Sequence, residues 1–355
     1  MFHTLSVKSI EKSTEDSSIV AFEVSPSLQP HFSFKAGQYL TLQAFIGGEE
    51  VRRSYSLCSS PNEYEWKVGV KKVPGGKFST FVNEQLRVGD TLEVMAPEGR
   101  FHIAIDPERK RNYVAFAAGS GITPIISLIK SHLHSEPNST FTLFFINQRV
   151  TSIMLKEELA GLKDLYVNRI EIFHFLTKEQ RTIPLFNGRI DAEKLEIISK
   201  TICDISAVNH FFMCGPESMI HMVNGFLQDK GVSKEQIHFE LFGTNTGKTQ
   251  AVKKELAHTY SGKPCQITIL EGGKSLQFQM EQGSTNVLDA ALNQSADLPF
   301  ACKGGVCATC KAKVESGEVK MLLTYGLEQE EIDEGYILSC QAIPTSEELV
   351  VNFDG

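Results

Sequence analysis

The chain has 355 residues, of which 41% are hydrophobic and 22% charged, and this composition indicates an ordinary globular protein of two or three domains. Its formal net charge is −8 and no basic stripe is present, which argues against a nucleic-acid partner. The lack of a secretory leader or of an apolar run of about 18 residues argues against a membrane partner. Its eight cysteines are typical of a cytoplasmic protein, because thiols stay reduced in the cytosol.

Residues 1–106 have the pattern of a small all-β domain. Short segments alternate between apolar and polar residues, and Gly, Pro, Asn and Asp punctuate them. This pattern predicts an antiparallel barrel or sandwich. The clearest predicted strands cover residues 19–24, 39–45, 66–71 and 91–95.

Two motifs in this domain have the chemistry of a flavin site. The first is Arg53-Ser54-Tyr55-Ser56, which offers a guanidinium for a phosphate, a ring to stack on isoalloxazine and a hydroxyl for the reactive N5. The second is a Gly-rich turn at 71–79 before a predicted helix over 80–86, whose N-terminus suits a pyrophosphate. Alone, the tetrapeptide is more typical of a solvated strand, but the pair favours a flavin site.

Residues 107–245 change to alternating strands and helices, which predicts a parallel α/β sheet. The predicted strands cover residues 113–118, 141–146, 170–174, 210–213 and 237–242.

Two strand ends in this domain suit a dinucleotide. The first strand runs into Gly119-Ser120-Gly121-Ile122-Thr123-Pro124 and a predicted helix over 125–134, with Thr123 as its N-cap and Pro124 as its first residue. The match to a dinucleotide fingerprint is partial, because Pro replaces the last Gly. The second strand end is Cys214-Gly215-Pro216, with Pro216 as the expected first residue of a helix. A simple packed cysteine explains Cys214 equally well on spacing alone.

Residues 246–262 are polar and aperiodic, and we expect a linker, with room for a short helix. The last segment, 263–355, begins with a predicted hairpin, 266–270 with 275–279, and a helix near 286–293. It holds 14 acidic and 6 basic residues and therefore the whole net charge of the chain. Such charge can steer a basic partner, although solubility alone accounts for it equally well.

Four cysteines in this segment have the ligand spacing of a plant-type [2Fe–2S] cluster. Cys302, Cys307 and Cys310 form a C-x4-C-x2-C run, and Cys340 follows after 29 intervening residues. Two glycines, at 304 and 305, let the backbone curl and direct N–H groups at sulfur. The alternatives are a zinc site or two disulfides. Zinc usually takes two C-x2-C pairs, and only one is present.

Taken together, the motifs resemble the ferredoxin–NADP⁺ reductase superfamily, and within it the oxygenase reductase components that carry a C-terminal plant-type ferredoxin domain. The resemblance covers nearly the whole chain. It implies an FAD-binding β-barrel (1–106), an NAD(P)-binding α/β domain (107–245), a linker (246–262) and a β-grasp [2Fe–2S] ferredoxin domain (263–355).

The resemblance also implies roles for matching positions. Cys214 would lie near nicotinamide C4, and Ser56 and Glu240 would complete the catalytic set. Implied FAD contacts are Arg53, Ser54, Tyr55, Ser56, Gly69, Val70, Lys71, Gly76, Lys77, Phe78, Ser79 and Phe242. Implied NAD(P)H contacts are Gly119, Ser120, Gly121, Ile122, Thr123, Pro124, Arg149, Thr177, Lys178, Cys214, Gly215 and Pro216. The metal ligands are Cys302, Cys307, Cys310 and Cys340.

The choice between NADPH and NADH depends on the next two strand ends. No acid follows the 141–146 strand, where NADH enzymes often bind the ribose hydroxyls. Arg149 and Lys178, with Arg181 or Arg189, would suit a 2′-phosphate, although ordinary surface charge explains them as well. We therefore expect NADPH, with NADH as the alternative.

The expected function is electron transfer from NADPH through FAD and [2Fe–2S] to an oxygenase. The nearest likeness within the class is to reductases that serve phenylacetyl-CoA epoxygenation, so this epoxygenase is the expected acceptor. A Rieske-type ring hydroxylase or another monooxygenase is the alternative. A redox sensor with inactive upstream domains is less favoured, because the Arg53–Ser56 and Gly119–Pro124 motifs are intact.

Overall fold

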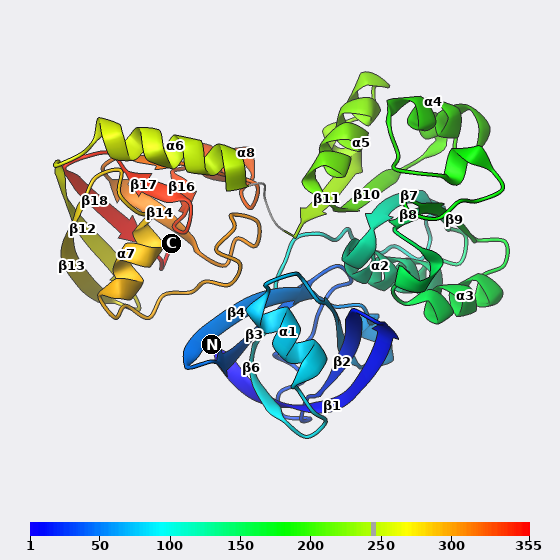
Figure 1. The fold of residues 1–355 in the computed structure, drawn as a ribbon, viewed down its shortest axis with the longest axis horizontal. Coiled ribbons are helices and arrows are strands. Elements are labelled where there is room, and N and C mark those ends of the chain that lie inside the picture. The colour runs from blue at the N-terminus through cyan, green and yellow to red at the C-terminus, as the bar shows by residue number, and fades with distance from the viewer. Residues whose placement is uncertain (243–245) are drawn as a thin grey trace. The chain divides into compact units, whose positions relative to one another are not determined.

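The N-terminal strands form a six-stranded antiparallel sheet in the order β4-β3-β6-β1-β2-β5. A bridge between Leu57 and Val68 joins the end of β4 to β5, so the sheet closes into the expected barrel around a core that includes Leu40 and Val94. The computed structural model describes residues 1–242 and 246–355, in two compact units, Met1–Phe242 and Gly243–Gly355 (Figure 1). The barrel strands are β1 (Phe2–Thr14), β2 (Ser17–Glu23), β3 (Tyr39–Ile46), β4 (Glu49–Ser56), β5 (Trp66–Lys71) and β6 (Thr91–Met95).

Helix α1 (Lys77–Glu84) begins three residues before the predicted helix over 80–86. The side chain of Ser79 explains the earlier start, because its Oγ accepts a hydrogen bond from Val73 N at 3.1 Å and lies 3.3 Å from Gly76 O. The turn therefore closes at Gly76, and the first helical N–H groups belong to residues 77–79. The helix buries Phe78 and Val82 in the barrel core.

The second part of the first unit is a five-stranded parallel sheet in the order β11-β10-β7-β8-β9, as the alternating pattern predicts. Helices α2 and α3 cover one face, and α4 and α5 lie on the other (Figure 1). The strands are β7 (Asn112–Ala118), β8 (Thr140–Asn147), β9 (Ile170–Leu176), β10 (His210–Gly215) and β11 (Ile237–Leu241). The helices are α2 (Ile122–Ser135), α3 (Lys156–Leu165), α4 (Ala192–Thr201) and α5 (Glu217–Asp229).

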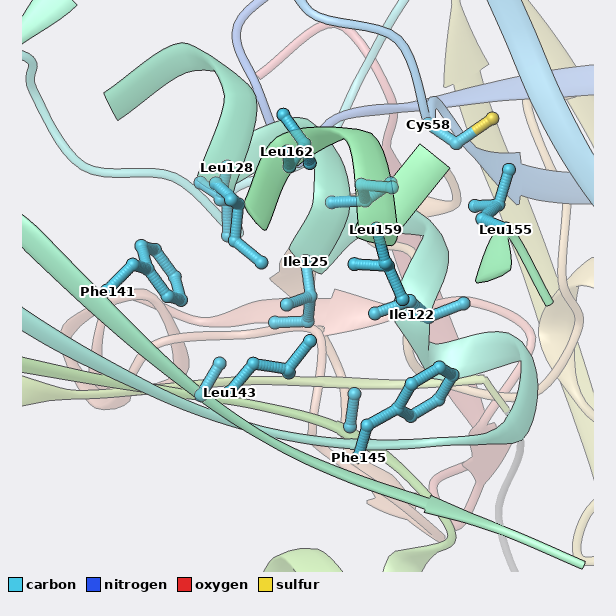
Figure 2. Packing of buried hydrophobic residues seen from close by; sticks show 14 of the residues in the cluster. Cys58, Ile122, Ile125, Leu128, Phe141, Leu143, Phe145, Leu155, Leu159 and Leu162 are labelled. Atoms are coloured by element: carbon cyan, nitrogen blue, oxygen red, sulfur yellow. The ribbon is translucent and has the colours of Figure 1, made fainter. Parts of the chain in front are cut away.

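The face beneath α2 is the main hydrophobic core of this unit (Figure 2). Side chains from α2, α3 and β8 meet there, including Ile125, Leu128, Leu143, Phe145 and Leu159. Each such buried side chain contributes roughly 1.5–3 kcal/mol relative to exposure. This packing holds the start of α2, and hence the glycine turn before it, in one place.

Two helix starts differ from the predicted ones. Helix α2 begins at Ile122 after a 3-10 turn over Gly119–Gly121, so Thr123 is inside the helix rather than at its N-cap. Pro124 still fits in the first turn of the helix. Proline has no N–H, and the N–H groups of a first turn have no acceptor within the helix, so no hydrogen bond is lost. Helix α5 begins at Glu217, which makes Pro216 its N-cap rather than its first residue.

A buried lysine joins the barrel to the parallel sheet within the first unit. Lys130 of α2 is 7% exposed. Its Nζ lies 3.0 Å from Glu63 Oε1, pairs with Glu158, and contacts Cys58 O at 3.3 Å. Desolvation is compensated here because the buried ammonium has two carboxylates and a carbonyl as partners. The contact fixes α2 against the segment that follows β4.

The second unit contains a five-stranded mixed sheet in the order β13-β12-β18-β14-β16, with the central pair β12 and β18 parallel. Helix α7 (Val287–Asn293), capped by Asn286, contributes Val287, Leu288 and Ala291 to its core. This arrangement is the expected β-grasp fold. The strands are β12 (Pro264–Glu271), β13 (Lys274–Glu281), β14 (Lys311–Ser316), β16 (Tyr336–Leu338) and β18 (Glu348–Asn352), with a separate pair β15 (Val319–Met321) and β17 (Ala342–Pro344).

The expected linker over 246–262 is largely a helix, α6 (Thr246–Thr259). Its last turn packs against Gly283 so closely that a Cβ there would lie 2.5 Å from Leu256 O. The predicted boundary at 245 lies outside the described residues, and the domain limits stay a prediction. No helix in the described ranges is long and apolar enough to cross a membrane.

Candidate flavin, nicotinamide and iron–sulfur sites

The three predicted catalytic side chains lie together in the first unit. Ser56, at the end of β4, donates a hydrogen bond from Oγ to Glu240 Oε2 at 3.0 Å, across 184 positions of sequence. Glu240 in β11 is paired in register with Cys214 in β10. The barrel therefore supplies the hydroxyl, and the parallel sheet supplies the carboxyl and the thiol.

The surroundings of this trio decide its protonation states. Burial raises the pKa of Glu240 to about 8, and the hydrogen bond from Ser56 offsets part of that rise. Burial, with a smaller effect from Glu240, raises the pKa of Cys214 well above its usual value. At neutral pH Glu240 therefore holds a proton, and Cys214 is a thiol rather than a nucleophilic thiolate.

Apart from Phe242, the other predicted flavin residues lie on β4, on β5 and around the start of α1. Arg53 is exposed, and its guanidinium contacts Arg52 O at 2.6 Å. The ring of Phe78 is 1% exposed and lies 5.8 Å, centroid to centroid, from Tyr55, so this phenylalanine supports the site from the core. Lys77 pairs with Glu49. The N–H groups that begin α1 remain suited to a pyrophosphate.

Further predicted flavin residues make ordinary contacts within the barrel. Ser54 Oγ lies 3.4 Å from Thr41 Oγ, and Lys71 Nζ lies 3.4 Å from Asp16 Oδ2. Val70 O accepts a hydrogen bond from Asn83 at 3.1 Å. Phe242, which follows β11, is 44% exposed.

The flavin strand and the nicotinamide turn touch at a glycine. A Cβ at Gly69 in β5 would lie 2.5 Å from Thr123 Cγ2, at the start of α2. A larger residue there would require the side chain of Thr123 to shift. The close approach brings the two predicted cofactor sites next to each other, as hydride transfer requires.

The nicotinamide turn and the Cys-Gly-Pro turn also touch at a glycine. A Cβ at Gly121 would lie 2.1 Å from Cys214 O and 2.9 Å from Gly215 N. Because both neighbours are backbone atoms of a central strand, they cannot move aside cheaply. The contact places both turns at the carboxyl edge of the sheet, where dinucleotides bind in such folds.

We therefore expect Gly121→Ala to force the two turns apart and to raise the KM for the nicotinamide nucleotide at least about tenfold, since a misplacement near 1 Å is costly in catalysis. Steady-state kinetics with a dye acceptor measure the change. Gly161→Ala is the matched control, because Gly161 in α3 has open space around its Cβ position. An unchanged KM in Gly121→Ala would contradict the assignment.

The region predicted to hold a 2′-phosphate is assembled from two strand ends. Lys178 N donates to Gln148 O at 2.8 Å, which sets Lys178 beside the residues that follow β8. Glu179 Oε2 accepts a hydrogen bond from Val150 N at 2.9 Å and ties the two segments together. Arg149 and Lys178 are both exposed at this edge. Sequence reasoning missed Glu179, because its partner lies 29 residues away.

A buried amide marks the same edge. Asn147, the last residue of β8, is 5% exposed, and neither polar atom of its side chain has a hydrogen-bond partner among the described residues. Such a group costs about 1–3 kcal/mol if it stays unpaired. Its backbone O accepts from Thr177 N at 2.9 Å. The unpaired side-chain amide suits a hydrogen bond to a bound nucleotide or to an ordered water.

The four predicted iron ligands form two pairs in the second unit. Cys302 and Cys307 lie within hydrogen-bonding reach of each other, and so do Cys310 and Cys340. No set of three or more His, Cys, Asp or Glu side chains in the described ranges converges on one metal position. Two pairs fit a two-iron cluster with two thiolates on each iron better than a single tetrahedral ion.

One thiol of each pair is favoured as a thiolate, because the hydrogen bond within the pair lowers the pKa at Cys302 and Cys340 and raises it at Cys307 and Cys310. The hydrogen bond from Cys307, helped by the backbone N–H groups of Val306 and Gly304, lowers the pKa of Cys302 to about 6. Gly304 N lies 3.2 Å from Cys302 Sγ. Gly305 has a φ of +76°, which favours glycine, whereas a Cβ at Gly304 would meet little. Glycine is therefore required at position 305, whereas the crowding expected at Gly304 is not found.

Comparison with known proteins gives three family matches in the same order. The oxidoreductase FAD-binding domain matches residues 4–103, the oxidoreductase NAD-binding domain 116–225, and the 2Fe-2S iron-sulfur cluster binding domain 269–345. The chain is 41% identical over 353 residues to an Escherichia coli (strain K12) protein named as a subunit of 1,2-phenylacetyl-CoA epoxidase, covering 99% of this chain and 98% of that protein. The chain belongs to the ferredoxin-reductase family of oxygenase reductase components.

A second relative of this reductase is the ferredoxin reductase component of 3-ketosteroid-9-alpha-monooxygenase from Rhodococcus rhodochrous, 30% identical with 98% of this chain and 96% of that protein covered. Phthalate dioxygenase reductase has the same fold, with a TM-score of 0.63 at 23% identity over 99% of this chain and 98% of that one. The predicted fold, the oxidoreductase class and the FAD, NAD(P)H and [2Fe–2S] cofactors of the reductase are thereby confirmed. The individual contact residues stay predictions.

Proposed function

We propose that this reductase takes electrons from NADPH and delivers them to an oxygenase that epoxidises phenylacetyl-CoA. The observation that carries the proposal is the full-length 41% identity to the Escherichia coli epoxidase component. A cytoplasmic location is part of the proposal and is supported by eight cysteines that form no disulfide.

The three cofactors, when bound, supply hydride transfer, storage of two electrons and their release one at a time at a potential of about −400 mV. The chain's own contribution is placement. The Gly69–Thr123 contact brings the flavin and nicotinamide sites together, and Cys214 packs at the strand end as a neutral thiol. Glu240 holds a proton, and Ser56 connects it to the flavin side.

An anaerobic titration with NADPH tests the reductase steps, and reconstitution tests the acceptor. We expect flavin bleaching followed by cluster reduction, and then phenylacetyl-CoA-dependent NADPH oxidation with epoxidase oxygenase subunits. The alternative acceptor, a Rieske-type hydroxylase or another monooxygenase, is supported by the lower identity of 30% to a 3-ketosteroid monooxygenase reductase. Faster turnover with a Rieske hydroxylase than with the epoxidase subunits would establish that alternative.

The NADPH preference has its own test in Lys178→Ala. A hydrogen bond to a charged phosphate contributes about 1.5–3 kcal/mol, so kcat/KM for NADPH should fall about tenfold or more while that for NADH stays unchanged. Lys200→Ala is the matched control, because Lys200 is an exposed lysine on α4 that pairs only loosely with Glu196, at 3.5 Å. Equal losses with NADPH and NADH would reject Lys178 as a 2′-phosphate contact.

A further inference from the structure

The residue after the last predicted iron ligand reaches back to the ligand loop. Gln341 is 6% exposed, and its Nε2 donates a hydrogen bond to Lys303 O at 3.0 Å. The same nitrogen lies 3.5 Å from Cys340 Sγ, within range of an N–H···S hydrogen bond. One side-chain amide therefore contacts both ends of the ligand set, which are 38 positions apart in sequence.

The amide has little freedom to leave this position. A Cβ at Gly305 would lie 2.8 Å from Gln341 Cγ, so the glutamine packs directly on the loop. Its backbone is fixed as well, since Gln341 N donates to Leu338 O at 2.8 Å and Gln341 O accepts from Leu322 N at 3.0 Å. The N–H group is thus preorganised toward sulfur rather than recruited to it.

We propose that Gln341 raises the reduction potential of the [2Fe–2S] cluster through its hydrogen bond to Cys340 and positions the ligand loop through Lys303. The inference rests on the proposed ligand set. It goes beyond that set, because Gln341 binds no iron.

The physical reason is the charge that reduction adds. The extra electron places more negative charge on the cluster and its thiolates, and an N–H donor at sulfur stabilises that charge more in the reduced state than in the oxidised state. The site is buried, so water does not replace the lost donor easily, and the effect is stronger than at a surface.

The loop has a second anchor that leaves the sulfur untouched. Lys303, with a left-handed φ of 49°, extends its Nζ to Asp289 Oδ1 at 2.7 Å. Asp289 lies in the first turn of α7, where its backbone N–H donates to the N-cap Asn286 Oδ1 at 2.7 Å and its Oδ2 accepts from Asn286 Nδ2 at 2.7 Å. The side chain of Lys303 therefore stays tied to α7 when the glutamine is changed, and a substitution at 341 is expected to change the potential more than the loop.

The test is Gln341→Met, which removes the donor and keeps the length of the side chain. Redox titration of the full chain, followed by electron paramagnetic resonance, should give a midpoint potential lower by about 59 mV, which is a tenfold loss in the equilibrium constant for one-electron reduction. Gln282→Met is the matched control. Gln282 is 3% exposed in the same unit, and its Nε2 bonds to Pro264 O, with no sulfur in reach.

A potential in Gln341→Met equal to that of the wild type would overturn the proposal, and so would an equal shift in Gln282→Met. If Gln341→Met does not load its cluster, Gln341→Asn decides. Asparagine keeps the amide, but its side chain is one methylene shorter, which draws the nitrogen back from both Lys303 O and Cys340 Sγ. A lowered potential in the Asn variant supports the role, and an unchanged one rejects it.

The hydrogen bond from Gln341 to the cluster can also be tested in the wild-type protein, without a substitution. With glutamine labelled by ¹⁵N in the side chain, pulsed electron paramagnetic resonance of the reduced cluster should detect one coupled amide nitrogen, and Gln341→Asn should lose it. No coupling in the wild type would reject the hydrogen bond. A wild-type protein with no [2Fe–2S] signal at all would instead refute the ligand set.

Discussion

Cys310→Ala should abolish electron delivery to the oxygenase while NADPH still bleaches the flavin. Cys310 is 2% exposed, pairs with Cys340, and its carbonyl is held by Ser339 N at 3.0 Å and Ser339 Oγ at 2.9 Å. Its position is fixed from both sides, so no other side chain can take the place of its sulfur. One iron would keep a single thiolate, and we expect no stable cluster.

The measurement is a comparison of two rates in the same preparation. Flavin reduction by NADPH, followed anaerobically, should stay within about twofold of wild type, and reduction of the oxygenase should fall to background. Cys265→Ala is the matched control, because Cys265 is a fully buried thiol in the same unit that belongs to the hydrophobic core and is not a predicted ligand. An intact [2Fe–2S] spectrum in Cys310→Ala would contradict the assignment.

Glu240→Gln should lower the turnover of NADPH with a dye acceptor by about 10²–10⁴-fold, the usual contribution of a positioned acid or base. The protonated carboxyl of Glu240 is the group connected to Ser56 Oγ, and the amide of a glutamine cannot release a proton near neutral pH. In the wild type the rate should fall as pH rises through about 8, where Glu240 ionises. The Gln variant should lack this alkaline fall.

The same pKa has a consequence for stability, with a definite sign. The carboxyl titrates near 4.5 when unfolded and near 8 in the native protein. Between these values the unfolded chain releases a proton that the native state keeps, so the native state loses stability as pH rises through this window. The difference in free energy of unfolding, Glu240→Gln minus wild type, should therefore increase between about pH 5 and about pH 8.5.

Denaturation by urea at the two pH values measures the difference. Glu235→Gln is the matched control, because Glu235 is an exposed acid just before β11. If wild type and Glu240→Gln showed the same pH dependence of both rate and stability, Glu240 would not be the titrating group.

The sequence was sufficient where local pattern determines structure. The parallel strands and most barrel strands lie within about two residues of their predicted positions, because apolar runs mark the parallel strands and apolar–polar alternation marks the barrel strands. The predicted strands omit β1, since Leu5 and Val7 are its only buried residues in a 13-residue run. The C-x4-C-x2-C spacing needed no fold to be recognised.

The parts that could not be predicted depend on distant contacts. The bond from Glu179 to Val150, the ion pairs of Lys130 and the approach of Gly121 to Cys214 each join segments that only the fold brings together. The start of α2 at Ile122 is a related case, because a 3-10 turn carries the chain from the strand into the helix before the predicted cap. Capping rules applied along the chain do not include such tertiary constraints.

Helix α6 changes how the iron–sulfur module should be delimited for exchange between proteins. The family match begins at residue 269, yet Leu256 lies against Gly283, and Gly262 N bonds to Glu281 Oε1 at 2.5 Å. A graft that starts at 263 would leave the surface at Gly283 uncovered and lose the partner of Glu281. Recombination, whether by evolution or by an engineer, therefore preserves the module best when the joint is placed upstream of Thr246.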